Sequence, residues 1–130
     1  MTETEERTTR TPAGLMAGLA APSQGSAQIS TWRVEMAEDV DSPLHLIDAD
    51  QIWMPISGTW EFTVGDETVR ATTGQTVVLE ANEPRRFRAV GGPAQALVAM
   101  PASGQAGAPG SDARQSLPWA DEHRDGGDGC

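Results

Sequence analysis

The sequence contains no lysine and no tyrosine, which excludes two kinds of active site. A chain without them can form neither a lysine Schiff base nor a tyrosine general acid. The single cysteine, Cys130, is the last residue of a Gly- and Asp-rich tail. An internal disulfide and a cysteine-rich zinc site are therefore excluded as well, and we interpret Cys130 as a solvated thiol.

Positive charge is also scarce, because 9 basic residues face 19 acidic ones and the formal net charge is −10. Binding to nucleic acid or to an anionic membrane surface requires a basic footprint that this composition does not supply. No stretch reaches the ~18 apolar residues of a membrane span, and the acidic start of the chain lacks the positive region of a secretory signal. We expect a cytoplasmic protein with a small-molecule substrate, and neither a nucleic-acid nor a membrane partner.

The chain has the length of one domain and divides into three zones. Residues 1–28 form a flexible lead, in which Thr11 and Pro12 can begin a short helix with Leu15, Met16 and Leu19 on one face.

Residues 102–130 are rich in Gly, Ala, Ser, Pro and Asp, so we expect this tail to be mostly disordered. Its only substantial apolar side chains are Leu117 and Trp119, and these are the candidates for docking on the domain.

The middle zone, 29–101, alternates short β-rich runs with turn residues, a pattern typical of an all-β sandwich or barrel. Gly65 and Asp66 suit a two-residue hairpin turn, with glycine in the first position. The expected strands are 29–36, 44–47, 51–56, 59–64, 68–71, 76–79, 85–90 and 94–100.

Two stretches of this zone resemble the two motifs of the cupin superfamily. The first motif reads His-x-His, a three- or four-residue spacer, Glu, six residues and Gly. In this chain His45 keeps its position, Ile47 replaces the second histidine, Gln51 replaces the glutamate and Gly58 ends the motif. In the second stretch, which begins at Gly74, an arginine stands where the last metal-binding histidine is expected.

That arginine is Arg85, and Glu80 and Asn82 occupy the usual proline and glycine positions of the second motif. The resemblance covers about half of the chain and implies a jelly-roll barrel of two antiparallel sheets with a ligand cavity at its mouth. It also implies a homodimer, since many relatives are dimers.

The substitutions disfavour a metal in the family position. Ile47 cannot ligate, Gln51 is a poor ligand, and Arg85 would repel a cation at ~4 Å by on the order of 4 kcal/mol. We therefore expect no cofactor. If a metal is present nonetheless, the remaining candidates are His45 with Asp48 and Asp50, although both aspartates also suit a turn between strands.

Without a metal, His45, Gln51 and Arg85 are the candidate catalytic residues. His45 can act as a general base or acid, Arg85 can hold a carboxylate or an enolate, and Gln51 can orient a carbonyl or hydroxyl. Such a set suits cyclisation, isomerisation or dehydration of a small oxygenated molecule, for example a secondary-metabolite intermediate. Arg85 can alternatively pair with a neighbouring surface glutamate, Glu80 or Glu83.

Three apolar side chains are the candidate substrate contacts, namely Ile47, Trp53 and Phe87. Trp53 shares a strand face with Gln51 and either stacks on a planar substrate or packs in the core. Two further functions remain open: a binding module without turnover, and a metal-dependent dioxygenase that uses His45 with carboxylates.

Overall fold

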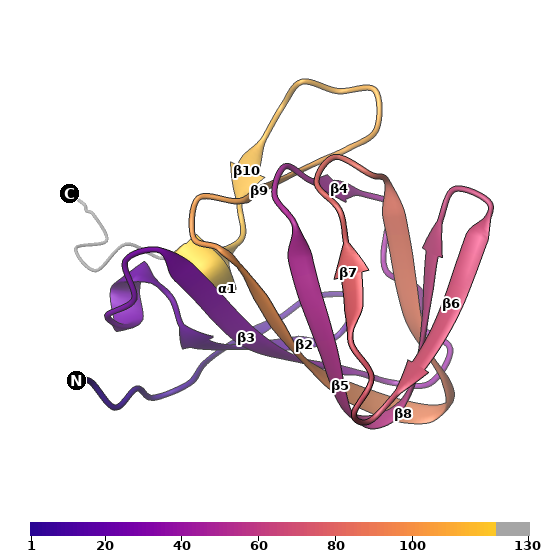
Figure 1. Ribbon diagram of the computed structural model, residues 1–130, viewed down its shortest axis with the longest axis horizontal. Coiled ribbons are helices and arrows are strands. Elements are labelled where there is room, and N and C mark those ends of the chain that lie inside the picture. Colours follow the sequence, from indigo (N-terminus) through magenta and orange to yellow (C-terminus); the bar gives the residue numbers. More distant parts are fainter. Residues whose placement is uncertain (122–130) are drawn as a thin grey trace.

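A computed structural model of the chain describes residues 1–121. In that part the chain forms ten strands, one 3₁₀ turn and one short α-helix (Figure 1). In chain order they are β1 (Arg7–Arg10), β2 (Leu15–Ala20), η1 (Pro22–Gln24), β3 (Ile29–Met36), β4 (Leu46–Ile47), β5 (Gln51–Val64), β6 (Glu67–Thr72), β7 (Val77–Leu79), β8 (Arg85–Pro101), β9 (Gln105–Gly107), β10 (Gln115–Ser116) and α1 (Pro118–Asp121).

Seven strands form one large antiparallel sheet in the order β1-β2-β3-β8-β5-β6, and β7 also pairs with β5. The remaining strands form a small antiparallel sheet in the order β10-β9-β4, which lies across one end of the large sheet (Figure 1). An isolated antiparallel bridge between His45 and Arg85 joins the two regions. The predicted all-β cupin fold of two antiparallel sheets is therefore confirmed.

The large sheet bends because its two longest strands change partners along their length. The first part of β5 pairs with β7 and its second part with β6, while β8 follows β5 throughout. The register shifts around Ser57 and Thr59, where Gly58 adopts a φ of +74°. A Cβ at Gly58 would lie 2.5 Å from the carbonyl oxygen of Pro93, so only glycine lets the two strands approach here.

The hairpin predicted at Gly65 and Asp66 is present, since Val64 pairs directly with Glu67. Gly65 has a φ of +59°, a conformation that glycine adopts without the strain of a side chain. The predicted strand at 29–36 is present with the same limits. The separate runs predicted at 51–56 and 59–64, and at 85–90 and 94–100, are in each case one continuous bent strand.

The helix predicted around Leu15, Met16 and Leu19 is wrong, because these residues belong to strand β2. Residues 15–20 pair with β3 on one side and with β1 on the other, and this pairing outweighs a weak local helix preference. The first 28 residues do contain a short helical turn, η1, but it follows the strand. This segment is consequently part of the barrel sheet, which extends beyond the predicted limits of 29–101.

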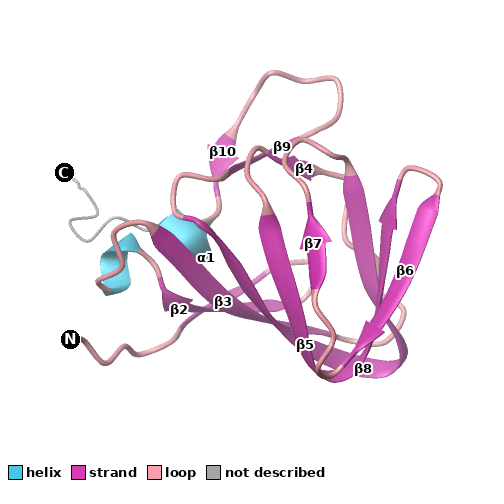
Figure 2. Ribbon diagram, in the orientation of Figure 1, coloured by secondary structure: helices cyan, strands magenta, loops and turns pink. Residues whose placement is uncertain are grey.

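The prediction of a mostly disordered tail is corrected for residues 102–121. There β9 pairs with β4, β10 pairs with β9, and α1 lies beside η1 and β3 (Figure 2). Leu117 and Trp119 pack against the core, and the buried hydroxyl of Ser30 donates a hydrogen bond to the carbonyl of Ala120. The docking expected for the 117–119 patch is thus present, whereas residues 122–130, with His123 and Cys130, lie outside the described residues.

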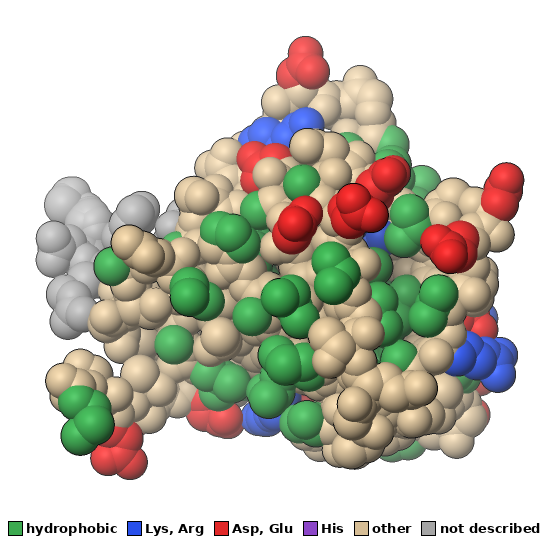
Figure 3. Space-filling model, in the orientation of Figure 1, with side chains coloured by type: hydrophobic (Ala, Val, Ile, Leu, Met, Phe, Trp, Pro, Cys, Tyr) green, Lys and Arg blue, Asp and Glu red, His purple; other side chains and the backbone are tan. Residues whose placement is uncertain are grey.

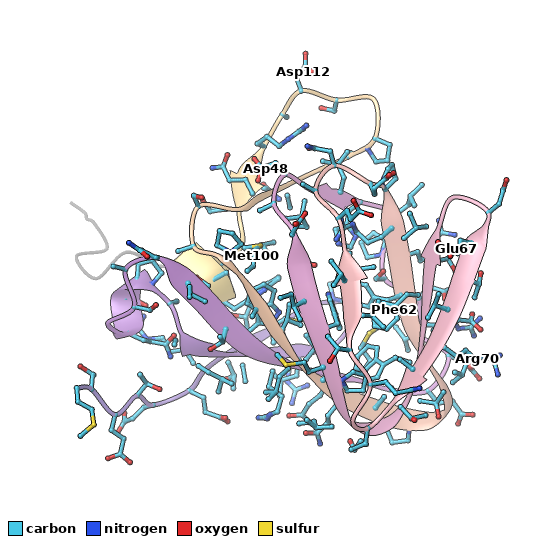
Figure 4. All side chains as sticks on the ribbon, viewed as in Figure 1. Asp48, Phe62, Glu67, Arg70, Met100 and Asp112 are labelled. Carbon is cyan, nitrogen blue, oxygen red and sulfur yellow. The ribbon has the colours of Figure 1, made fainter. Side chains whose placement is uncertain are left out.

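The core contains a cluster of four aromatic rings. The Trp53 ring centroid lies 4.6 Å from that of Phe87, 5.3 Å from that of Phe62 and 5.4 Å from that of Trp60. Each such pair adds about 0.5–1.5 kcal/mol beyond the burial of its apolar area. Figure 4 shows Phe62 pointing from β5 into the barrel. This cluster supports the β5 and β8 backbones that carry the candidate site.

The outer face of the large sheet is partly apolar, as the green side chains over β3, β5 and β7 show in Figure 3. Ile52 and Val78 are paired across β5 and β7, and both are exposed, as are Ile29 and Ile56. Within residues 1–121 no helix is long and apolar enough to cross a bilayer.

Candidate functional site

The barrel interior contains a small cavity of about 40 Å³ beside the aromatic cluster. Five of the six predicted site residues line it: His45, Ile47, Gln51, Trp53 and Phe87. A cavity that binds an organic ligand usually has about 300–1,000 Å³. The family position for a metal or ligand is therefore almost filled by side chains in this chain.

Arg85, the sixth predicted residue, does not line this cavity. It is completely buried, and its guanidinium donates to Gln51 Oε1 at 3.3 Å and to the backbone carbonyls of Glu80 at 2.6 Å and Glu83 at 2.8 Å. Burial lowers the pKa of Arg85 to about 10, against the opposing attraction of Glu83 and Asp50, so the guanidinium stays charged at neutral pH. Within the described residues Arg85 thus holds Gln51 and the loop before β8, and its catalytic role stays a prediction.

The side chain of Gln51 is held by its neighbours. Its Oε1 accepts hydrogen bonds from Arg85 Nη1 and, at 3.2 Å, from Trp53 Nε1, while its Nε2 lies 3.6 Å from the sulfur of Met100. Both acceptor positions of the amide oxygen are occupied by these protein donors. Gln51 and Trp53 consequently act as one packed unit, which fits the core interpretation of Trp53 better than substrate stacking.

His45 is the predicted residue that keeps an available functional atom. Its Nδ1 lies 2.8 Å from the carbonyl oxygen of Pro43, which makes Nδ1 the donor and Nε2 the acceptor in the neutral ring. Nε2 has no hydrogen-bond partner among residues 1–121. Burial, opposed by the Pro43 hydrogen bond and assisted by the charge of Arg85, lowers the pKa of His45. A neutral imidazole with a free Nε2 is a competent general base at neutral pH.

His45 also lines a second and larger cavity of about 540 Å³, which we call the outer groove. The groove is bordered by the β1–β2 turn, the segment 42–45 and the segment 106–119. Met16, Phe87, Leu117 and Trp119 line both the groove and the inner cavity, so these side chains form a common wall. The groove has the size of a small-molecule site, and His45 is the titratable side chain at its inner end.

Sequence reasoning did not identify most of the groove, because half of its wall comes from the segment expected to be disordered. Arg114 and Gln115 line it together with Leu117 and Trp119. The apolar patch at 117–119 in an otherwise polar tail was the one available signal. Nothing in the sequence pattern indicated that Arg114 would lie beside His45 in a common cavity.

The two aspartates suggested as metal ligands stabilise loops instead. Asp48 Oδ1 accepts a hydrogen bond from the backbone N–H of Gln105 at 2.7 Å, and Asp50 Oδ1 accepts one from Ala81 at 2.8 Å. Figure 4 shows Asp48 at the end of the barrel near β9. In the part of the chain that the structure describes, no three His, Cys, Asp or Glu side chains converge, so the donors do not fit a divalent metal.

A two-sheet barrel of this kind, with an aromatic core and degenerate metal positions, defines a small cupin. Residues 7–126 match the model of the AraC-binding-like domain, and the chain belongs to that family. No curated protein matches the chain.

Solved structures of other proteins show a similar fold at low sequence identity. The polyketide cyclase RemF from Streptomyces resistomycificus is similar with a TM-score of 0.65 and 17% identity, over 75% of this chain and 73% of that one. KdgF from Halomonas sp. is similar with a TM-score of 0.63 and 14% identity, over 75% and 86%. Oxalate decarboxylase from Bacillus subtilis gives a TM-score of 0.68 and 13% identity over 78% of this chain, which spans only 28% of that enzyme.

Proposed function

We propose that this chain is a metal-independent small cupin enzyme that binds a small oxygenated molecule in the outer groove and moves a proton on it with His45. The observation that carries the proposal is the free Nε2 of a neutral imidazole at the inner end of a groove of about 540 Å³. The expected reactions are cyclisation or isomerisation, in which Nε2 removes a proton from carbon or oxygen and returns it at another atom of the same molecule.

Among the described lining residues the groove contains no carboxylate, so His45 would serve both as base and, once protonated, as acid. A single acid–base group suits an isomerisation or a ring closure, in which the proton that His45 removes is returned to the same molecule. The similarity in fold to a polyketide cyclase supports a search among cyclisable ketones, although at 17% identity it is evidence of fold alone.

A second function, binding without turnover, is favoured by the match to the AraC-binding-like domain. It is also favoured by the described groove lining, in which His45 is the one side chain that changes charge near neutral pH. This candidate predicts saturable binding of a small apolar molecule and no proton transfer. The two candidates share the groove and differ only in what His45 does there.

Proton exchange on 2-tetralone, an enolisable ketone with an apolar body, separates the two candidates. The protein, freed of metals by a chelator, is incubated with the ketone in deuterated buffer, and loss of the α-proton signal is followed by NMR. We expect acceleration over buffer that falls by about 100-fold or more in His45→Gln.

The matched control is Val78→Ser, an exposed position on β7 outside the groove lining, which should retain the wild-type rate. Equal rates for wild type and His45→Gln would contradict the role of His45. Exchange no faster than in buffer would reject the enzyme and leave the binding module.

A further inference from the structure

The wall of the outer groove carries one permanent positive charge in a strongly acidic protein. Among the lining residues that the structure describes, Arg114 is the only Arg or Lys side chain, and no Asp or Glu accompanies it there. The chain as a whole has a formal net charge of −10. A cation that lines an apolar groove and forms no ion pair with the described residues remains available for an anionic ligand.

The guanidinium of Arg114 is held by one of its three nitrogens. Nη1 donates to the backbone carbonyl of Ser111 at 2.9 Å and to that of Ala113 at 3.0 Å, which uses both of its N–H groups. Nε and Nη2 make no hydrogen bond or ion pair with any residue in 1–121. These two nitrogens form the edge of the guanidinium that binds a carboxylate through two parallel hydrogen bonds.

Gly107 provides the space for this arrangement. A Cβ on Gly107 would lie 2.5 Å from Nη1 and 3.1 Å from Cζ of Arg114. The φ of Gly107 is not in the left-handed region, and its partner in the sheet is Leu46, so the backbone itself does not require glycine. The absence of a side chain at this position instead lets the guanidinium lie against strand β9.

A second donor on the same wall is unused. The indole Nε1 of Trp119 is buried and has no hydrogen-bond partner among the described residues. Trp119 lines the groove together with Arg114 and His45. A buried N–H without an acceptor is costly, so the Trp119 side chain leaves one donor of this wall unsatisfied within residues 1–121.

We propose that the ligand of the outer groove is a small apolar carboxylic acid, whose carboxylate is bound by the Nε–Nη2 edge of Arg114. This assigns to Arg114 the anion-binding role that the sequence motif suggested for Arg85. The inference rests on the proposed function, because it places the ligand in the same groove as His45.

The test compares 2-naphthoate with 2-naphthamide, a neutral compound of nearly the same shape, in NMR titrations at pH 7.5. The indole N–H resonance of Trp119, assigned with a Trp119→Phe variant, reports binding in the groove. We expect the wild type to bind 2-naphthoate about tenfold more tightly than 2-naphthamide, the scale of one charge-assisted bidentate contact at a solvated site. Arg114→Gln should lose this preference by weakening the binding of 2-naphthoate alone.

Arg86→Gln is the matched control, since it removes one exposed arginine charge outside the groove and should keep the preference. A wild-type protein that binds both compounds equally, or an Arg114→Gln variant that still prefers 2-naphthoate, overturns the assignment and leaves the groove and His45 untouched. If neither compound binds, both the inference and the placement of a ligand in the groove fail. If the wild type does not accelerate 2-tetralone exchange but still prefers 2-naphthoate to 2-naphthamide, only the proton-transfer proposal is contradicted.

Discussion

The Nη1 atom of Arg85 lies 3.3 Å from Oε1 of Gln51, and this contact joins the two cupin motifs at the positions of two expected metal ligands. A direct hydrogen bond between two protein side chains thus connects these strands. The remaining guanidinium donors bind the backbone of the loop before β8. Arg85 therefore contributes to the stability of the barrel.

Replacing this arginine should destabilise the fold. Arg85→Met keeps most of the side-chain volume but leaves the carbonyls of Glu80 and Glu83 without the donor that Arg85 supplies, and Gln51 Oε1 with the Trp53 indole as its one remaining donor. We expect the free energy of unfolding to fall by about 3 kcal/mol in urea denaturation. Arg86→Met, at an exposed neighbouring position, should change it by less than about 0.5 kcal/mol. Equal stability of the two variants would show that the buried contacts do not stabilise the protein.

The pH dependence of His45 follows from its lowered pKa, which burial causes first and the charge of Arg85 increases. In NMR titration we expect the His45 midpoint below its ordinary value of 6.5, and His45→Gln identifies its signal. Because the folded pKa lies below the unfolded one, the stabilising contribution of His45 is present above pH 6.5 and is lost as the pH falls through the folded pKa. A midpoint at or above 6.5 would contradict the burial of the neutral ring.

The same shift predicts the pH profile of the proposed reaction. Nε2 must be unprotonated to act as base, so the 2-tetralone exchange rate should be constant near pH 7 and decrease on acidification only below the ordinary histidine value. The midpoint of this decrease should coincide with the His45 midpoint from NMR. A rate that decreases around a clearly different pH would assign the proton transfer to another group.

Gly18→Ala tests the docking of the C-terminal segment on β2. The added Cβ would lie 2.8 Å from the carbonyl oxygen of Trp119, so the segment 115–121 should move away from the barrel. We expect faster amide hydrogen exchange in that segment and weaker binding of 2-naphthoate, with the strands of the large sheet still protected. Thr8→Ala, on the adjacent strand, is the control and should change neither. Unchanged exchange in 115–121 would mean that the close contact is easily relieved.

Gly107→Ala tests the support of Arg114 without removing its charge. The methyl group would occupy the position that Nη1 needs for its contacts with Ser111 and Ala113. We expect the preference for 2-naphthoate over 2-naphthamide to fall several-fold while 2-naphthamide binds as before. The circular dichroism spectrum should remain that of the wild type. An unchanged preference would show that Arg114 does not depend on its place against β9.

The central barrel could be predicted from the sequence because its strands alternate apolar and polar residues. Residues 29–36 alternate between the two faces of the sheet, and Gly65 terminates β5 where a tight turn needs it. The same alternation continues at the start of β8, where Arg85 and Phe87 are buried and Arg86 is exposed. The sequence could not predict the hydrogen-bond acceptors of Arg85, because two of them are backbone carbonyl groups of a loop, which every residue has.

The edges of the molecule were harder to predict for a physical reason. Strand β2 contains small residues such as Ala17 and Gly18 with little β preference of their own, and β3 and β1 determine its conformation by pairing with it. The wall around Trp119 likewise depends on tertiary contacts of a polar segment. The homodimer implied by the resemblance stays a prediction.

The pairing of β3 with β8 joins two strands that lie far apart in the sequence. Ile29 lies beside Pro101, so a loop that includes most of the barrel must close before this ladder forms. Topologies dominated by such distant pairings fold in about milliseconds to seconds. Ala120 is anchored to Ser30 of that ladder, so the C-terminal wall of the groove docks on a strand that this distant pairing holds in place. The rate at which the ladder closes should therefore limit how fast the proposed binding site appears during refolding.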